Sequence, residues 1–65
     1  MLSKNIKKFR KKLRLSQEQL AQKAGITYST LIKIESGANK NPTIATMRKI
    51  SKTLEVSLDK LLEEV

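Results

Sequence analysis

Apolar residues in this chain recur at helical intervals in five separate segments. In the first segment Leu2, Ile6, Phe9 and Leu13 lie four, three and four residues apart, which places them on one face of a helix. No run of residues alternates between apolar and polar positions, so the pattern gives little support for strands. We therefore expect one all-α domain, a compact five-helix bundle with helices at about 3–14, 17–24, 28–36, 44–54 and 58–64.

Capping residues divide the middle of the chain into two short helices. Ser16 is a favoured N-cap, and Gln19, three residues later, is placed to return a hydrogen bond to the Ser16 backbone. Gly25 tolerates the left-handed backbone that ends a helix, and Thr27 is placed to cap the next one. Two helices this short, joined by so few residues, must cross steeply. This is the helix-turn-helix arrangement, whose second helix can lie in the DNA major groove.

The last two helices follow a loop at residues 37–42 that is rich in turn-forming residues. Thr43 is the expected cap of the first of them and Ser57 that of the second. The last helix, at about 58–64, has more apolar residues than so small a bundle can bury. We therefore expect most of them in the core and the remainder in a two-fold dimer contact. These residues are Leu58, Leu61, Leu62 and Val65.

The charge of the chain points to a polyanionic partner. It has 14 basic and 6 acidic residues, a formal net charge of +8 over 65 residues. Residues 1–14 contain no acid, whereas most of the acids lie near the other end of the chain. We expect the lysines of the first helix to provide long-range attraction and a few phosphate contacts.

Several classes of function are disfavoured by what the sequence lacks. Cysteine and histidine are absent, so there is no thiolate metal site and no nucleophile–histidine pair, and we expect no enzyme, no metal and no cofactor. No apolar stretch is long enough to cross a membrane, and no apolar segment of a signal peptide follows the basic start. We expect a cytoplasmic protein that does not bind membranes.

At this point four segments together match a known pattern. The chain resembles the phage repressor and Cro-type (XRE-like) helix-turn-helix family, to which the lambda repressor DNA-binding domain belongs. The matching segments are LSQEQLAQKAGI at 15–26, STLIKIESG at 29–37, Pro42-Thr43-Ile44, and LEVSLDKLL at 54–62. The resemblance implies a five-helix bundle in which the second helix crosses the DNA backbone and the third enters the major groove.

The resemblance also implies roles for particular residues. The start of the third helix would contact bases through Tyr28, Ser29 and Lys33. The phosphate contacts would come from Gln17, Thr27, Ser36, Asn39, Lys40 and Asn41. Arg10 and Glu35 would form a structural ion pair between the first and third helices. Repressors of this kind often use glutamine at the base-reading positions, and this chain has none there, so their base preferences do not transfer.

The chemistry of these side chains leaves alternatives open. Lys33 suits guanine N7 or O6 but also a phosphate, and Tyr28 suits a base or a phosphate. Ser29 can instead satisfy a free backbone amide near the helix start. Ile32, one turn from Tyr28, is either partly buried or in contact with a thymine methyl group.

Taken together, the sequence predicts a sequence-specific regulator of transcription that binds double-stranded DNA. We expect a repressor that binds a palindromic operator as a homodimer. The alternative is an antitoxin or another protein-interaction module that uses the same fold and has a protein partner. A third possibility, a membrane-surface peptide formed by the first helix, predicts helicity that depends on lipid.

Overall fold

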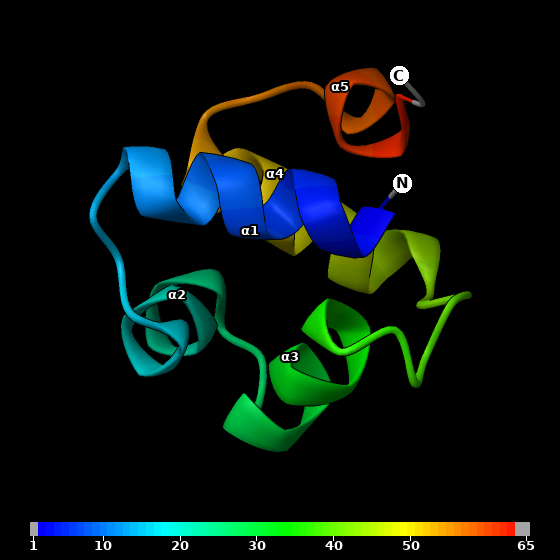
Figure 1. The fold of residues 1–65 in the computed structure, drawn as a ribbon, viewed down its shortest axis with the longest axis horizontal. Coiled ribbons are helices and arrows are strands. Elements are labelled where there is room, and N and C mark those ends of the chain that lie inside the picture. Colours follow the sequence, from blue (N-terminus) through cyan, green and yellow to red (C-terminus); the bar gives the residue numbers. More distant parts are fainter. Residues whose placement is uncertain (1, 64–65) are drawn as a thin grey trace.

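The computed structural model describes residues 2–63, and this part of the chain is entirely helices and connecting turns. The helices are α1 (Leu2–Lys12), α2 (Gln17–Ala24), α3 (Tyr28–Glu35), α4 (Ile44–Leu54) and α5 (Leu58–Leu62). Figure 1 shows α1 across the front of the molecule, α4 behind it, α2 and α3 below and α5 above. The expected all-α, five-helix fold is confirmed.

Four of the helix starts coincide with the predicted caps. The hydroxyls of Ser16, Thr27, Thr43 and Ser57 each accept a hydrogen bond from the backbone N–H three residues further on. Each bond satisfies one of the amides that have no acceptor within the first turn of a helix. At Ser16 the capping box is complete, because Gln19 Oε1 accepts a bond from the Ser16 backbone N–H at 2.8 Å.

Helix ends differ more from the sequence expectation than helix starts do. Helix α1 ends at Lys12 rather than residue 14, because Arg14 adopts a left-handed backbone with φ of 58° and reverses the chain. Helix α3 ends at Glu35, one residue earlier than expected. Helix α5 ends at Leu62, whereas the expected end at residue 64 lies outside the described residues.

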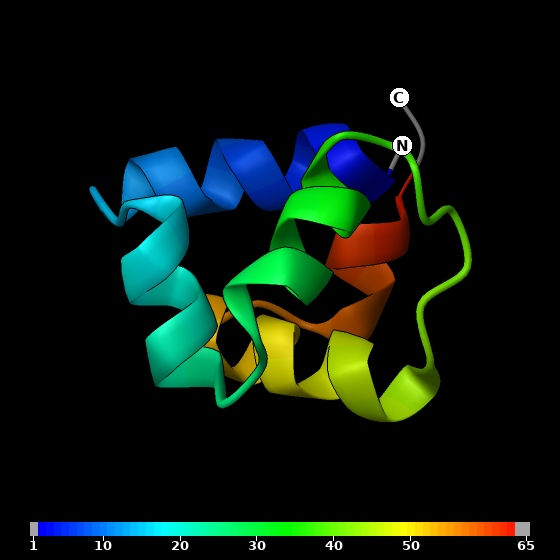
Figure 2. The same cartoon turned by 90° about the horizontal axis from the view of Figure 1, so that it is seen from below.

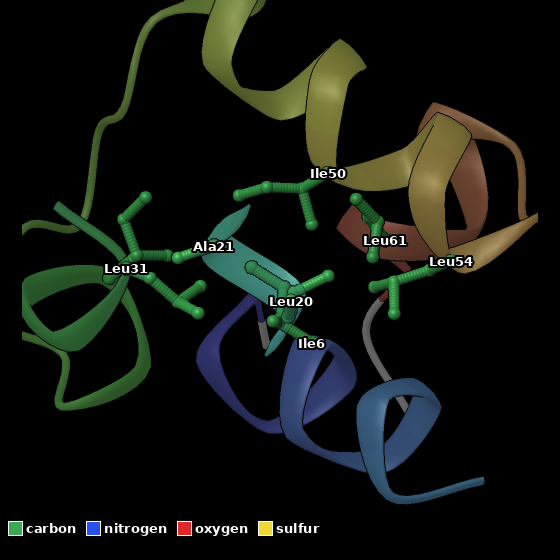
Figure 3. Close-up of a cluster of buried hydrophobic side chains, with 8 residues drawn as sticks. Ile6, Leu20, Ala21, Leu31, Ile50, Leu54 and Leu61 are labelled. Carbon is green, nitrogen blue, oxygen red and sulfur yellow. The ribbon is translucent and has the colours of Figure 1, made fainter. Parts of the chain in front are cut away.

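The core joins all five helices in one cluster (Figure 3). One side chain from each helix has no exposed surface, namely Ile6, Leu20, Leu31, Ile50 and Leu61. Leu13, which was expected on the apolar face of the first helix, is 41% exposed because it lies beyond the end of α1. Ile44, an apolar residue at the first position of α4, is 52% exposed. The core holds α2 and α3 against α1 and α4, which fixes the orientation of the helix-turn-helix.

Candidate nucleic-acid interface

Helices α2 and α3 form the predicted helix-turn-helix. Gly25 ends α2 with φ of 73°, and the backbone N–H of Ile26 then donates to Ala21 O at 3.0 Å. Thr27 follows immediately and caps α3. Figure 2 views the molecule from the side of α3, which crosses the middle, with α1 along one edge and α4 along the opposite edge. Helix α3 therefore presents one side to solvent while its other side packs on the core.

The buried side of α3 consists of Leu31, Ile34 and Glu35. The exposed side includes Tyr28, which is 50% exposed, together with Ser29 and Lys33. Ser29 and Lys33 are four residues apart and thus neighbours on the helix surface. The structure brings a phenol, a hydroxyl and an ammonium group to one exposed side of a short helix, which is the chemistry used to contact base edges and phosphates.

Ile32 lies one helical turn from Tyr28, between Tyr28 and Lys33 on the helix surface. It is partly buried, so both alternatives raised from the sequence remain compatible with its position. Its contact with a thymine methyl group stays a prediction.

The loop after α3 is ordered by its own polar side chains. Ser36 Oγ donates to Lys33 O at 3.2 Å and accepts from the Ala38 N–H at 3.3 Å. Asn39 Oδ1 accepts from the Asn41 N–H at 3.1 Å. Lys40 lies between these two asparagines and is exposed. The bonds hold the loop beside the end of α3, on the same flank where the resemblance places phosphate contacts.

Thr27 makes a different use of its hydroxyl. Thr27 Oγ1 accepts a bond from the Thr30 N–H at 3.1 Å and donates to Thr30 Oγ1 at 2.7 Å. These bonds explain the position of Thr27 as a helix cap, and its contact with phosphate stays a prediction.

A buried polar network ties the helix-turn-helix to α1. Arg10 Nε lies 2.9 Å from Glu35 Oε2, and Arg10 Nη2 donates to Glu35 Oε1 at 3.1 Å. Arg10 Nη1 also donates to Leu15 O at 2.8 Å in the turn before α2. Glu35 is 1% exposed and Arg10 has 13% of its side chain exposed. The bidentate pair assigned from the resemblance is therefore present, and it also fixes the turn between α1 and α2.

The network has a third member that sequence reasoning missed. Gln17 Nε2, at the first position of α2, donates to Glu35 Oε1 at 3.1 Å. Gln17 and Glu35 are separated by 18 residues, and no periodicity in the sequence links them. An amide nitrogen carries two hydrogens, so this bond leaves a second N–H on Gln17 for the expected phosphate contact.

The residues expected in a dimer contact lie in different environments. Leu61 has no exposed surface, so it is one of the residues expected in the core and is not available for a dimer contact. Leu58 is partly buried, Leu62 is 45% exposed, and Val65 lies outside the described residues. Asn5 of α1 fixes the end of α5, since its Nδ2 donates to Leu61 O at 2.8 Å and to Glu63 O at 2.6 Å.

The described residues form neither a metal site nor a membrane-spanning helix. Between residues 2 and 63, the structure contains no group of three or more carboxylates placed to hold a metal ion. None of the helices in that range has the length and apolar character that crossing a bilayer requires.

Comparisons of sequence and of structure with known proteins point to the same family. Residues 6–61 match the model of the helix-turn-helix family. The HTH-type transcriptional regulator SinR of Bacillus subtilis is 41% identical over 64 residues, which cover 98% of this chain and 58% of SinR. The chain therefore spans little more than half the length of this relative.

Two solved structures of SinR have the same fold as this chain. A crystal structure of SinR, described as the master regulator for biofilm formation, in complex with DNA has a TM-score of 0.94 at 40% identity. The match covers 97% of this chain and 100% of the SinR chain. A complex of the SinR and SinI proteins has a TM-score of 0.95 at 41% identity and covers 98% of this chain and 62% of that one. The chain belongs to the helix-turn-helix family of the Cro/C1 (XRE) type.

Proposed function

We propose that this protein is a sequence-specific double-stranded DNA-binding regulator of transcription. The observation that carries the proposal is the exposed side of α3, where Tyr28, Ser29 and Lys33 project from a helix whose opposite side is anchored in the core. The solved complex of SinR with DNA, at 40% identity, supports the same use of the fold. In this proposal α3 enters the major groove, and Gln17 and the loop after α3 contact phosphates on either side.

The further details of the proposal concern assembly and mechanism. The protein binds a palindromic operator as a homodimer and represses by occluding polymerase. Two α3 helices must lie about 34 Å apart to read half-sites one helical turn apart. Leu62, which is exposed at the end of α5, and Leu58 are the residues of this chain proposed for the contact. The protein works by binding alone, without catalysis or a cofactor, in the cytoplasm.

The experiment that tests the proposal is selection of binding sites from a random duplex library at two salt concentrations. A palindromic consensus with half-sites about one helical turn apart supports a dimeric operator-binding regulator. Binding without any consensus, lost steeply as salt rises, means non-specific electrostatic attraction and contradicts the proposal. Sedimentation with and without the selected duplex then measures whether two copies bind each site.

A second candidate function is a protein-interaction module, such as an antitoxin. The observation in its favour is the solved complex in which the relative SinR is bound to a protein, SinI. Mass measurement of complexes purified from native cells separates the two candidates. A stoichiometric protein partner, together with a duplex selection that yields no consensus site, favours the protein-interaction module.

A further inference from the structure

The outward side of α1 is a continuous basic surface. Five lysines of this helix, which we call the lysine face, are all exposed: Lys4, Lys7, Lys8, Lys11 and Lys12. Ile6 on the opposite side is fully buried, and Leu2 and Phe9 pack against the core. Neither of the ion pairs Arg10–Glu35 and Lys60–Glu63 includes a member of the lysine face.

This arrangement is unfavourable for α1 in isolation. Lys4 and Lys8, Lys7 and Lys11, and Lys8 and Lys12 are each four residues apart, and like charges at that spacing repel. The first turn of α1 contains no acidic residue that could balance the charge of Lys4 or interact favourably with the positive end of the helix dipole. The dipole favours Lys11 and Lys12 at the other end only. A row of phosphates along the helix relieves this repulsion.

The lysine face and the exposed side of α3 point in different directions, because each lies on the side of its own helix opposite the core. Helix α3 is attached to α1 through Arg10, and α5 is attached through Asn5. The lysines lie between these two flanks, on the side of α1 opposite the core. In Figure 2, α3 crosses the middle of the view and α1 forms one edge of the molecule. A duplex held by α3 therefore lies beside the lysine face and not across it.

We propose that the lysine face binds the phosphate backbone of a second segment of duplex DNA while α3 occupies the major groove of the first. This inference rests on the proposed function, because α3 must hold the first duplex. The protein then joins two duplexes or two distant segments of one. The occupant is recognised by charge alone, so the second segment carries no sequence requirement.

An anionic membrane presents phosphates too, but α1 is poorly suited to it. Helices that bind at a membrane surface insert an apolar side among the acyl chains. The apolar side of α1 is used by the core, where Ile6 is fully buried. A rigid row of phosphates, as in duplex DNA, needs no such insertion.

The test is capture of a second duplex. Beads carry a duplex with a selected site, the protein is added, and a labelled duplex of unrelated sequence is supplied at several salt concentrations. The test variant is Lys4→Gln/Lys8→Gln/Lys11→Gln. The matched control is Arg48→Gln/Lys49→Gln/Lys52→Gln, which removes the same charge from exposed positions of α4.

If each lysine neutralises one phosphate, the plot of log affinity against log salt concentration for the second duplex becomes less steep by about 2.7 in the test variant. Between about 50 and 200 mM salt, the affinity of the variant then falls roughly 40-fold less than that of the wild type. Binding of the test variant to the bead duplex falls no further than that of the control variant, which has lost the same net charge, and the control variant still captures the labelled duplex. This result supports the proposal.

Other outcomes overturn it in distinguishable ways. Equal loss of capture in both variants means that only net charge matters. A parallel loss of bead-duplex binding in the test variant places the lysines on the first duplex. Displacement of the protein from the labelled duplex by vesicles containing phosphatidylserine at matched charge identifies a membrane surface. If the wild type fails to bind the bead duplex, the proposed function itself fails.

Discussion

Replacing Arg10 by Met should destabilise the fold and thereby imitate a DNA-binding defect. The substitution removes both guanidinium bonds to Glu35, which is 1% exposed, and the bond to Leu15 O. Gln17 then remains as a neutral donor to a buried carboxylate. Breaking a buried ion pair by removing one partner costs about 3–5 kcal/mol. For a chain of 65 residues the whole stability is about 3–10 kcal/mol, so the loss is a large part of it.

Thermal unfolding followed by circular dichroism measures this effect. Because 1 kcal/mol shifts the melting temperature of so small a domain by about 4–8 °C, we expect Arg10→Met to lower it by roughly 12–40 °C. The double variant Arg10→Met/Glu35→Gln removes the buried charge as well and should recover part of the loss. Relative to the wild type, Arg10→Met should bind DNA much less weakly at a temperature where the variant is folded than at 37 °C.

Two outcomes refute this reasoning. A melting temperature within a few degrees of the wild type for Arg10→Met means that the pair contributes little to the fold. A double variant no more stable than the single one means that the lost packing of Arg10, rather than the unpaired carboxylate, accounts for the effect. In the first case a loss of DNA binding by Arg10→Met has to be assigned to a phosphate contact, whereas in the second case it is still a consequence of the less stable fold.

Further substitutions test the interface and the helix ends. Lys33→Ala should change the base tolerated at one operator position by about 1–3 kcal/mol, whereas a uniform loss across all duplexes assigns Lys33 to a phosphate; Lys23→Ala removes the same charge as a control. Gln17→Ala should weaken specific and non-specific binding alike, at a temperature where it is folded, and a changed base preference contradicts its assignment. Glu55→Gly should raise the stability measured by thermal unfolding by roughly 0.5–1 kcal/mol, because Glu55 has φ of 60°, and a fall in stability excludes that account.

The helix starts and the core were predictable from the sequence because their causes are local. Ser16 and Gln19 form a capping box through bonds that span three residues, so the residue types and their spacing specify the geometry. Ile6 and Leu31 are buried because they lie on the apolar sides of their helices. The apolar pattern was less reliable at the ends, where Leu13 and Ile44 have no neighbouring turn to cover them.

The contact between Gln17 and Glu35 shows why the candidate interface was only partly predictable. The resemblance assigned Gln17 to a phosphate and Glu35 to an ion pair, and neither assignment implied that the two side chains meet. Their bond depends on how the start of α2 lies against the end of α3, which the whole core determines. Tertiary contacts of this kind leave no periodic trace in one sequence, whereas the exposed residues of α3 follow from helical geometry alone.

The C-terminal ends of three helices also depend on tertiary contacts. Helices α1, α2 and α4 end alike: the residue after the turn donates its N–H five residues back, from Leu15 to Arg10, Ile26 to Ala21 and Val56 to Ser51. This is the hydrogen bond of the Schellman motif, which favours glycine at the left-handed position. Glycine is present there only at Gly25, while Arg14 and Glu55 adopt positive φ values. Leu15, Ile26 and Val56 all pack against the core, and such an apolar contact commonly accompanies the motif. We infer that burial of the residue after the turn offsets the cost of the left-handed backbone, so an apolar residue there indicates a helix end that the lack of glycine conceals.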